Sequence, residues 1–306
     1  MVSSNETSPT TEASLFSHAE ALVGEAPLWD PRAGCLWWTD LARGRLHVSD
    51  ARGHAIATRT LGTWIGGIAL DGAGGIVAAV DDGVWSVRGE RVEQRAALEL
   101  DARAERVNDA ACDPYGRLWV SVVGTEPRRE PGSLHVVERG EARRVLEGLA
   151  FPNGVDWSPD GSAMYVAESD ARRISRFEVD RVRGRLGARS TFVRLPDDDG
   201  LPDGLAVDAT GALWVAVWGA GEVRRYSPAG RQIAVVSCPA PQVSSCALGG
   251  PAGRTLYVTS ATQGMTAGER SAHPLAGSVF AARAPAAGLV PRPYRDPKGS
   301  ADAQLR

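Results

Sequence analysis

A sixfold repeat of one strand–turn–strand pattern runs through the chain and limits what it can fold into. Each copy has a short apolar segment, a turn rich in Asp, Pro and Gly, and a second segment rich in β-branched and aromatic residues. The second segments are LWWTD, IVAAV, LWVSV, MYVAE, LWVAV and LYVTS. The copies open at Glu25, Gly66, Asn108, Asn153, Asp203 and Ser245, at spacings of 41, 42, 45, 50 and 42 residues. Such a regular period predicts an array of supersecondary units.

Most copies are followed by a third segment that alternates apolar and polar residues, such as GRLHVSD and GSLHVVE, and a fourth strand fits in each unit. Four strands in roughly 40 to 50 residues are typical of a propeller blade. We therefore predict an all-β, six-bladed β-propeller with four-stranded antiparallel blades around a central channel. The alternatives are an open repeat array or two β-sandwiches.

The predicted propeller spans residues 15–298, between a disordered N-terminal tail (residues 1–14) and a C-terminal tail (residues 299–306). Two ways of closing the ring are open. The first blade could take its outer strand from the C-terminal segment near GLVPRPYR. Alternatively, the last blade could take one from the N-terminal segment SLFSHAEAL.

Composition excludes several functional classes. The 306 residues are 43% hydrophobic and 23% charged with a net charge of −3, so nothing favours a nucleic-acid partner or an anionic membrane surface. No apolar run approaches the ~20 residues that span a bilayer, and the polar N-terminus lacks the pattern of a signal peptide. The four cysteines form no CxxC pair, which predicts free thiols in a cytoplasmic protein. The oligomeric state stays open.

The opening residues of the six copies form a candidate ring. In a propeller the innermost strands line the channel, so equivalent positions lie at one height around the axis. Five of these six residues carry a side-chain oxygen, and a set of two carboxylates and two amides suits a hard divalent cation. Asp and Asn also cap turns at strand entrances, which is the alternative for any one of them. Their coincidence at one repeat phase favours the metal site.

Other catalytic patterns are absent from the sequence. The five histidines show no HxH or HExxH spacing, and there is no GxSxG motif. Most tryptophans fall within strands, where packing explains them, but Trp64 and Trp218 lie near strand ends and could line a pocket.

Five segments resemble the SMP-30/gluconolactonase/luciferin-regenerating-enzyme family, in order and at similar separations, over residues 20–297. They are GEAPLWD (24–30), RVNDAACDPYGRLWV (106–120), FPNGVDWSPDG (151–161), LPDGLAVDATGALWVA (201–216) and PLAGSVF (274–280). The resemblance implies a six-bladed propeller with one divalent metal on its axis. The metal ligands that it implies are Glu25, Asn153 and Asp203. It also implies that Asn108 binds the metal through water or contacts substrate, and that Arg106 reaches the substrate.

Many members of this family hydrolyse sugar lactones, so the resemblance implies a metal-dependent lactonase with a small-molecule lactone substrate. Asp203 is our candidate general base, because a carboxylate beside the metal can take a proton from water. We expect Ca²⁺ first, with Zn²⁺, Mn²⁺, Mg²⁺ or Fe²⁺ as alternatives. Two other hypotheses stay open: the same site acting on another ester or pathway intermediate, and a non-catalytic calcium- or ligand-binding propeller.

Two segments depart from the family pattern near the expected pocket mouth. Residues 124–134 are shorter than the usual acidic loop, which carries a substrate-contacting Glu in some members, so Glu126 or Glu130 could substitute. Glu168 stands where relatives often have Asp. Both differences bear on the substrate more than on the metal.

Overall fold

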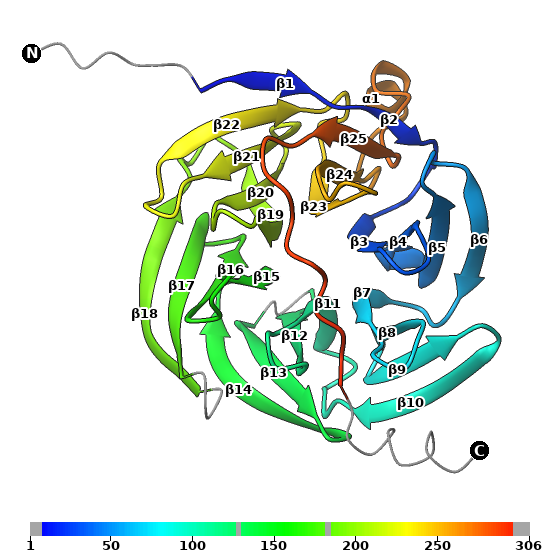
Figure 1. The fold of residues 1–306 in the computed structure, drawn as a ribbon, viewed down its shortest axis with the longest axis vertical. Coiled ribbons are helices and arrows are strands. Elements are labelled where there is room, and N and C mark those ends of the chain that lie inside the picture. Colours follow the sequence, from blue (N-terminus) through cyan, green and yellow to red (C-terminus); the bar gives the residue numbers. More distant parts are fainter. Residues whose placement is uncertain (1–7, 127–129, 181–184, 296–306) are drawn as a thin grey trace, which may run out of the picture.

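Six antiparallel sheets stand in a ring around a central channel (Figure 1). The structure is a computed structural model that describes residues 8–126, 130–180 and 185–295. Each sheet has four antiparallel strands, and one sheet gains a fifth strand in parallel. The prediction of a six-bladed β-propeller is therefore confirmed, and the open array and the paired sandwiches are wrong.

The first three blades follow the chain from the inner to the outer strand. Blade 1 contains β3 (Gly24–Asp30), β4 (Cys35–Asp40), β5 (Arg45–Asp50) and β6 (Ala55–Thr60). Blade 2 contains β7 (Ile65–Leu70), β8 (Ile76–Val80), β9 (Gly83–Arg88) and β10 (Arg91–Ala97). Blade 3 contains β11 (Glu105–Cys112), β12 (Leu118–Gly124), β13 (Gly132–Glu138) and β14 (Glu141–Leu149).

The other three blades repeat this order. Blade 4 contains β15 (Pro152–Trp157), β16 (Ala163–Glu168), β17 (Arg173–Asp180) and β18 (Arg185–Arg194). Blade 5 contains β19 (Leu201–Val207), β20 (Leu213–Trp218), β21 (Glu222–Tyr226) and β22 (Gln232–Ser237). Blade 6 contains β23 (Val243–Gly249), β24 (Thr255–Ser260) and β25 (Val279–Arg283). Two short helices, η1 (Leu41–Arg43) and α1 (Ala267–Ala272), lie in connections between strands.

The N-terminal segment closes the ring. Strand β2 (Ser14–Ser17) pairs antiparallel with β25 as the outer strand of blade 6, and β1 (Thr10–Glu12) pairs in parallel with β22 of blade 5. Of the two predicted closures, the N-terminal one is confirmed and the C-terminal one is wrong, because blade 1 already has β6 as its outer strand.

The tail predicted for residues 1–14 differs from the structure over part of its length. Residues 10–12 and 14 lie in strands, because the exposed backbone groups of edge strands β22 and β25 can pair with them. Residues 1–7 lie outside the described part of the chain, as does the C-terminal tail predicted for residues 299–306.

The core is divided among the interfaces between blades. Each neighbouring pair of blades shares its own cluster of buried apolar side chains. Between blades 3 and 4, for example, Trp119 and Trp157 meet edge to face with ring centroids 6.0 Å apart. Between blades 6 and 1, Trp29 stacks on Tyr257 at 5.8 Å. The apolar segments of the repeat therefore join blades to one another.

The structure shows the state of the cysteines and the character of the helices. All four cysteines are free, as predicted; Cys35, Cys112 and Cys246 are buried, and Cys238 is half-buried. Within the described ranges, we find no helix with the length and apolar character needed to cross a membrane.

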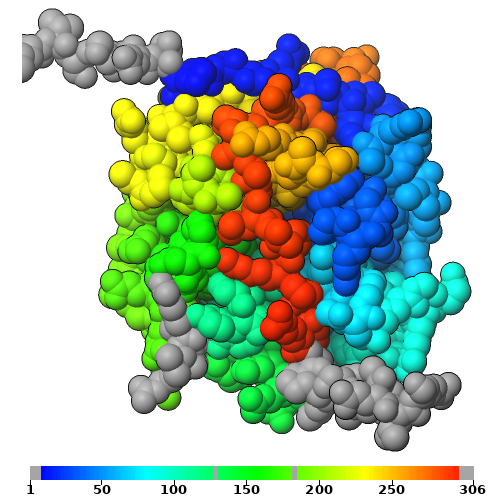
Figure 2. Space-filling model, in the orientation of Figure 1, coloured from blue at the N-terminus to red at the C-terminus, as the bar shows by residue number. Residues whose placement is uncertain are grey.

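A C-terminal strap, residues 284–295, crosses the face of the propeller after β25. It runs over the centre of the ring and covers it in the space-filling view (Figures 1 and 2). Backbone hydrogen bonds join it to several blades: Ala287 accepts from Ala209, Gly288 donates to Gly253, and Tyr294 donates to Leu70. Its residues 289–292 line the channel, so the strap closes the channel at this end.

The strap should contribute to stability through Tyr294, which is 1% exposed and packs in the core between blades 2 and 3. We expect Tyr294→Ala to lower the free energy of unfolding by about 3–5 kcal/mol, because it leaves a cavity in this core. Val290→Ala is the matched control in the same strap, since Val290 is 79% exposed, and it should change stability by less than about 0.5 kcal/mol. Urea denaturation measures both, and equal small effects would contradict a packed strap.

Candidate metal centre

The five predicted site residues line one pocket at the end of the channel opposite the strap. Glu25, Asn108, Asn153 and Asp203 come from the inner strands β3, β11, β15 and β19, and Arg106 from β11 lies beside them. The four ring residues are buried, with exposed fractions of 3% to 7%. Later residues of the same inner strands line the channel between this pocket and the strap.

A β-bulge lies at the ring position of every blade. The register between inner and second strand shifts at Glu25/Leu28, Ile65/Ile68, Val107/Asp109, Pro152/Val155, Pro202/Leu205 and Val243/Ser245. A bulge re-aims the side chain that it contains. In blade 1 it places Ala26 at a φ of 46°, and the Ala26 N–H donates to Glu25 Oε2 at 2.9 Å.

The observed register in blade 6 places Ser244, and not the predicted Ser245, at the ring position. Ser245 pairs with Thr259 and lines the channel, whereas Ser244 is the residue at the register shift. The prediction of Ser245 was one residue off because the following turn is longer: Leu248 pairs with Leu256, whereas Cys112 pairs with Leu118 in blade 3.

Close packing of the inner strands explains the glycine after Asn153 and the one after Asp203. A Cβ at Gly154 would lie 2.5 Å from the backbone nitrogen of Leu205 in the next blade. A Cβ at Gly204 would lie 2.0 Å from Ser245 Oγ. The NG and DG pairs therefore lie within inner strands, where neighbouring backbones leave no space for a side chain.

The two asparagines have different hydrogen-bond partners. Asn108 Oδ1 accepts from Arg106 Nη1 at 2.7 Å, while its Nδ2 donates to the Pro152 carbonyl at 3.2 Å. Asn153 Nδ2 donates to Ser169 Oγ at 3.4 Å, and no described residue donates to its Oδ1. The oxygen of Asn153 is therefore available to a cation, whereas that of Asn108 is already bonded to Arg106.

The two ring carboxylates lie in a strongly desolvated environment. Burial, and then the charge of Asp109, raise the pKa of Glu25 to about 8. Burial, and then the charges of Glu25 and Asp109, raise the pKa of Asp203 well above its usual range. Asp203 Oδ1 is buried and has no hydrogen-bond partner among the described residues. A positive charge nearby would favour both anions, so these residues fit a bound cation.

The donor set also limits the kind of metal. Within the described residues, no group of three or more His, Cys, Asp or Glu side chains is spaced to hold a metal. Here the donors are two carboxylates and an amide oxygen, a set that suits hard cations and leaves positions for water.

Aromatic and apolar side chains form the pocket wall around Arg106. Its guanidinium carbon lies 4.2 Å from the centroid of Trp64 and 5.7 Å from that of Phe151. Trp218 lines the same pocket, so both tryptophans proposed from their strand-end positions are there. Further lining residues that sequence reasoning missed are Val23, Leu41, Ser169, Asp170, Leu201 and Gln263. Most of these follow or precede strands without a repeat phase to identify them.

The model of the SMP-30/gluconolactonase/LRE-like region matches residues 23–262 of this chain. The chain belongs to this family. The 6-deoxy-6-sulfogluconolactonase of Pseudomonas putida is 32% identical over 269 residues, which cover 86% of this chain and 91% of that protein. Pentonolactonase XacC of Haloferax volcanii is 33% identical over 243 residues, which cover 78% and 81%.

A solved structure extends the match to the whole fold. The calcium-binding protein regucalcin from Agrobacterium tumefaciens superposes with a TM-score of 0.88 at 28% identity. The superposition covers 94% of this chain and 99% of that chain. The family resemblance predicted from the five sequence segments is therefore confirmed.

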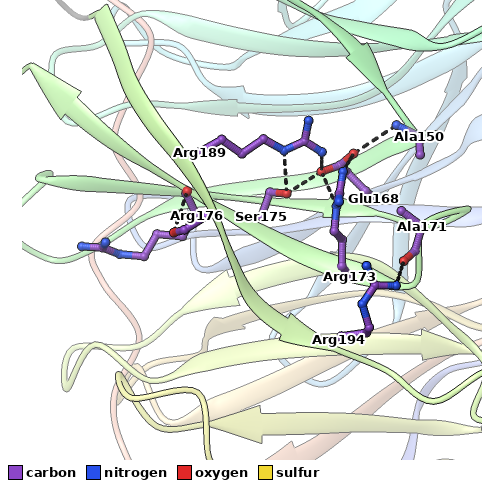
Figure 3. Close-up of polar contacts among 9 residues, drawn as sticks. Ala150, Glu168, Ala171, Arg173, Ser175, Arg176, Arg189 and Arg194 are labelled. Carbon is purple, nitrogen blue, oxygen red and sulfur yellow. Dashed lines mark hydrogen bonds and ion pairs between the residues drawn. The ribbon is translucent and has the colours of Figure 1, made fainter.

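Glu168, where the chain differs from many family members, lies outside the described pocket lining. It is fully buried, and its carboxylate accepts hydrogen bonds from Arg173 at 3.1 Å and from Ser175 and Arg189 (Figure 3). It also accepts from the Ala150 N–H at 3.1 Å, just before Phe151. The expectation that Glu168 bears on what the protein binds is thus corrected: its oxygens are used to hold the loop that leads into β15.

The shortened loop is only partly described. Glu126 and Glu130 flank residues 127–129, which lie outside the described part of the chain. Neither glutamate is among the described residues that line the pocket. Replacement of the family's loop glutamate by one of them stays a prediction.

Replacing Glu168 should test its structural role. Burial alone would raise its pKa, but hydrogen bonds from Arg173, Ser175, Ala150 and Arg189 hold the pKa below its usual value. We expect Glu168→Gln to lower the free energy of unfolding by about 1.5–3 kcal/mol at pH 7, because the partly exposed guanidinium groups of Arg173 and Arg189 lose the buried anion that accepts their hydrogen bonds.

Because the folded pKa is lowered, the stabilisation is complete above the unfolded value near 4.5 and is lost as pH falls through the folded value. The difference between wild type and Glu168→Gln should therefore shrink in urea titrations repeated below about pH 4. Glu178→Gln, an exposed position on β17 of the same blade, is the control. A variant as stable as wild type at pH 7 would rule out this role.

Proposed function

We propose that the protein is a metal-dependent lactonase that opens a sugar lactone to its hydroxy acid. The observation that carries this proposal is the buried Asp203 Oδ1 without a hydrogen-bond partner among the described residues, close enough to Glu25 for its charge to raise the Asp203 pKa. The relatives add the substrate class, since two of them are named as a sulfogluconolactonase and a pentonolactonase. The cytoplasmic location expected from the sequence stays a prediction.

Glu25, Asn153 and Asp203 would hold the cation, for which we propose Ca²⁺ first and Zn²⁺, Mn²⁺, Mg²⁺ or Fe²⁺ as alternatives. When bound, a divalent cation supplies Lewis acidity toward a carbonyl oxygen and lowers the pKa of a coordinated water. The neighbouring protein groups would do the rest. Arg106, held by Trp64 and Asn108, offers N–H groups that orient the lactone oxygens.

Asp203 is the candidate general base. Its free oxygen would take a proton from the attacking water as the bond between the water oxygen and the lactone carbonyl carbon forms. The bond from that carbon to the ring oxygen then breaks, and the proton passes to the ring oxygen as it leaves. The product is one hydroxy acid, so the atoms of lactone and water are all accounted for.

Two alternatives keep the same pocket. The apolar wall formed by Trp64, Phe151 and Trp218 would also suit another ester with an apolar substituent. A non-catalytic calcium-binding propeller is the second alternative, since the similar regucalcin structure is described as a calcium-binding protein.

Metal removal separates these functions. After EDTA treatment and gel filtration, we expect acid release from gluconolactone and from a pentonolactone to fall to the spontaneous rate. Addition of one of the five cations should restore it, because the carboxylates alone cannot stabilise the developing negative charge. A pH-stat measures the rate, with enzyme-free lactone as control. Metal binding without turnover of either lactone would favour the binding protein, and activity on aryl esters alone would favour the second substrate class.

The base is tested by Asp203→Asn. The amide keeps a ligand oxygen but cannot accept the proton, so kcat should fall about 10²- to 10⁴-fold in samples with bound metal. Metal content measured on the same samples separates loss of the base from loss of the cation. Full turnover in the metal-loaded variant would assign the proton transfer to another group.

A further inference from the structure

Ser169 follows the second strand of blade 4 and lies beside two of the residues expected to hold the metal. It is 4% exposed and lines the pocket, yet its hydroxyl is fully used within the protein. We propose that Ser169 is a positioning residue that turns the oxygen of Asn153 toward the cation and ties Asn153 to Asp203. This inference rests on the metal site of the proposed function.

The hydrogen atoms of the contact fix the direction of the Asn153 amide. Ser169 Oγ lies 2.7 Å from the carbonyl oxygen of Pro202, and a carbonyl can only accept, so the single hydroxyl hydrogen is donated there. Ser169 Oγ is left with lone pairs on the side of Asn153, at 3.4 Å. Only the NH₂ end of the amide can donate to them.

An amide has two ends of almost the same size, so shape alone does not select which one faces the pocket. With Nδ2 held by Ser169, Oδ1 must lie on the other side of the amide group. A reversed amide would present two N–H groups to a cation and would repel it. Ser169 therefore determines whether Asn153 presents its oxygen or its N–H groups to the cation.

The same serine joins neighbouring blades at the ring. Pro202 immediately precedes Asp203 on β19 of blade 5, while Asn153 lies on β15 of blade 4. The Ser169 N–H also donates to the Phe151 carbonyl at 3.1 Å, two residues before Asn153. One residue thus sets the position of both the amide and the carboxylate strand, which is the arrangement expected of a partner behind a metal ligand.

A double-mutant cycle tests the proposal through binding. Isothermal titration with CaCl₂, and with the other four cations, gives the dissociation constant of wild type, Ser169→Ala, Asn153→Asp and the double variant. We expect Ser169→Ala to weaken binding about 10- to 100-fold. A carboxylate at position 153 presents an oxygen in either orientation, so Ser169→Ala should cost less than about threefold in the Asn153→Asp background.

Two further variants control for general damage. Ser86→Ala removes another buried hydroxyl, which donates to Asp71 at 2.9 Å in blade 2, and should leave cation affinity unchanged. Ser169→Thr keeps the hydroxyl and should bind more tightly than Ser169→Ala. Circular dichroism melting of the metal-free proteins verifies that each variant is folded.

The outcomes are distinct. An equal loss of affinity from Ser169→Ala in both backgrounds would overturn the proposal, because it would indicate a structural effect that does not depend on the amide. Unchanged affinity in the Asn153 background would overturn it too. A wild-type protein that binds none of the five cations would remove the proposed function itself, and the inference with it.

Discussion

The hydrogen bonds between β2, near the N-terminus, and β25, the last strand of blade 6, close the ring on which the site depends. Where the ring closes, the inner strands of blades 6 and 1 also meet, and the Ser244 hydroxyl donates to the carbonyl of Gly24, next to Glu25. Each inner strand packs between two others, so the place of Glu25 relative to Asp203 is set by the closed ring and by no single blade. The geometry of the candidate metal centre therefore depends on closure of the ring.

Closure also explains how the protein tolerates two desolvated carboxylates at the site. Burial is the first cause of the raised pKa values of Glu25 and Asp203. Negative charge nearby is the second: that of Asp109 acts on Glu25, and those of Glu25 and Asp109 act on Asp203. The surrounding inner strands are closely packed, because Gly154 and Gly204 lie against their neighbours without space even for a methyl group. Six apolar interfaces between blades hold this arrangement, so the stability of the fold opposes the repulsion at its centre.

The repeat was enough to predict the fold and four residues of the pocket, because equal phase on inner strands places residues at equal height. Glu25, Asn108, Asn153 and Asp203 do line one pocket, although their roles as ligands stay predictions. In blade 6 the same method named Ser245 in place of Ser244, because the turn after the inner strand is longer there. Strand β1 could not be predicted, because its exposed residues attach through backbone pairing that leaves little side-chain pattern. The strap could not be predicted either, because Tyr294, which packs in the core between blades 2 and 3, has no counterpart in the repeat. The role of Glu168 was hidden because its arginine partners come from strands later in the chain.

The strap leaves the channel open at one end only in the described structure. Its residues 289–292 close one end, so in the described structure a ligand reaches the ring from the other end, past Trp64, Phe151 and Trp218. Water and substrate would then share one entrance with an aromatic wall, and a ligand that fills it displaces water from around Arg106 and Asp203. Electrostatic interactions strengthen when water leaves. In the proposed lactonase the apolar wall would therefore have two consequences. It would select the ligands that enter, and it would strengthen the attraction between the buried carboxylates and the cation.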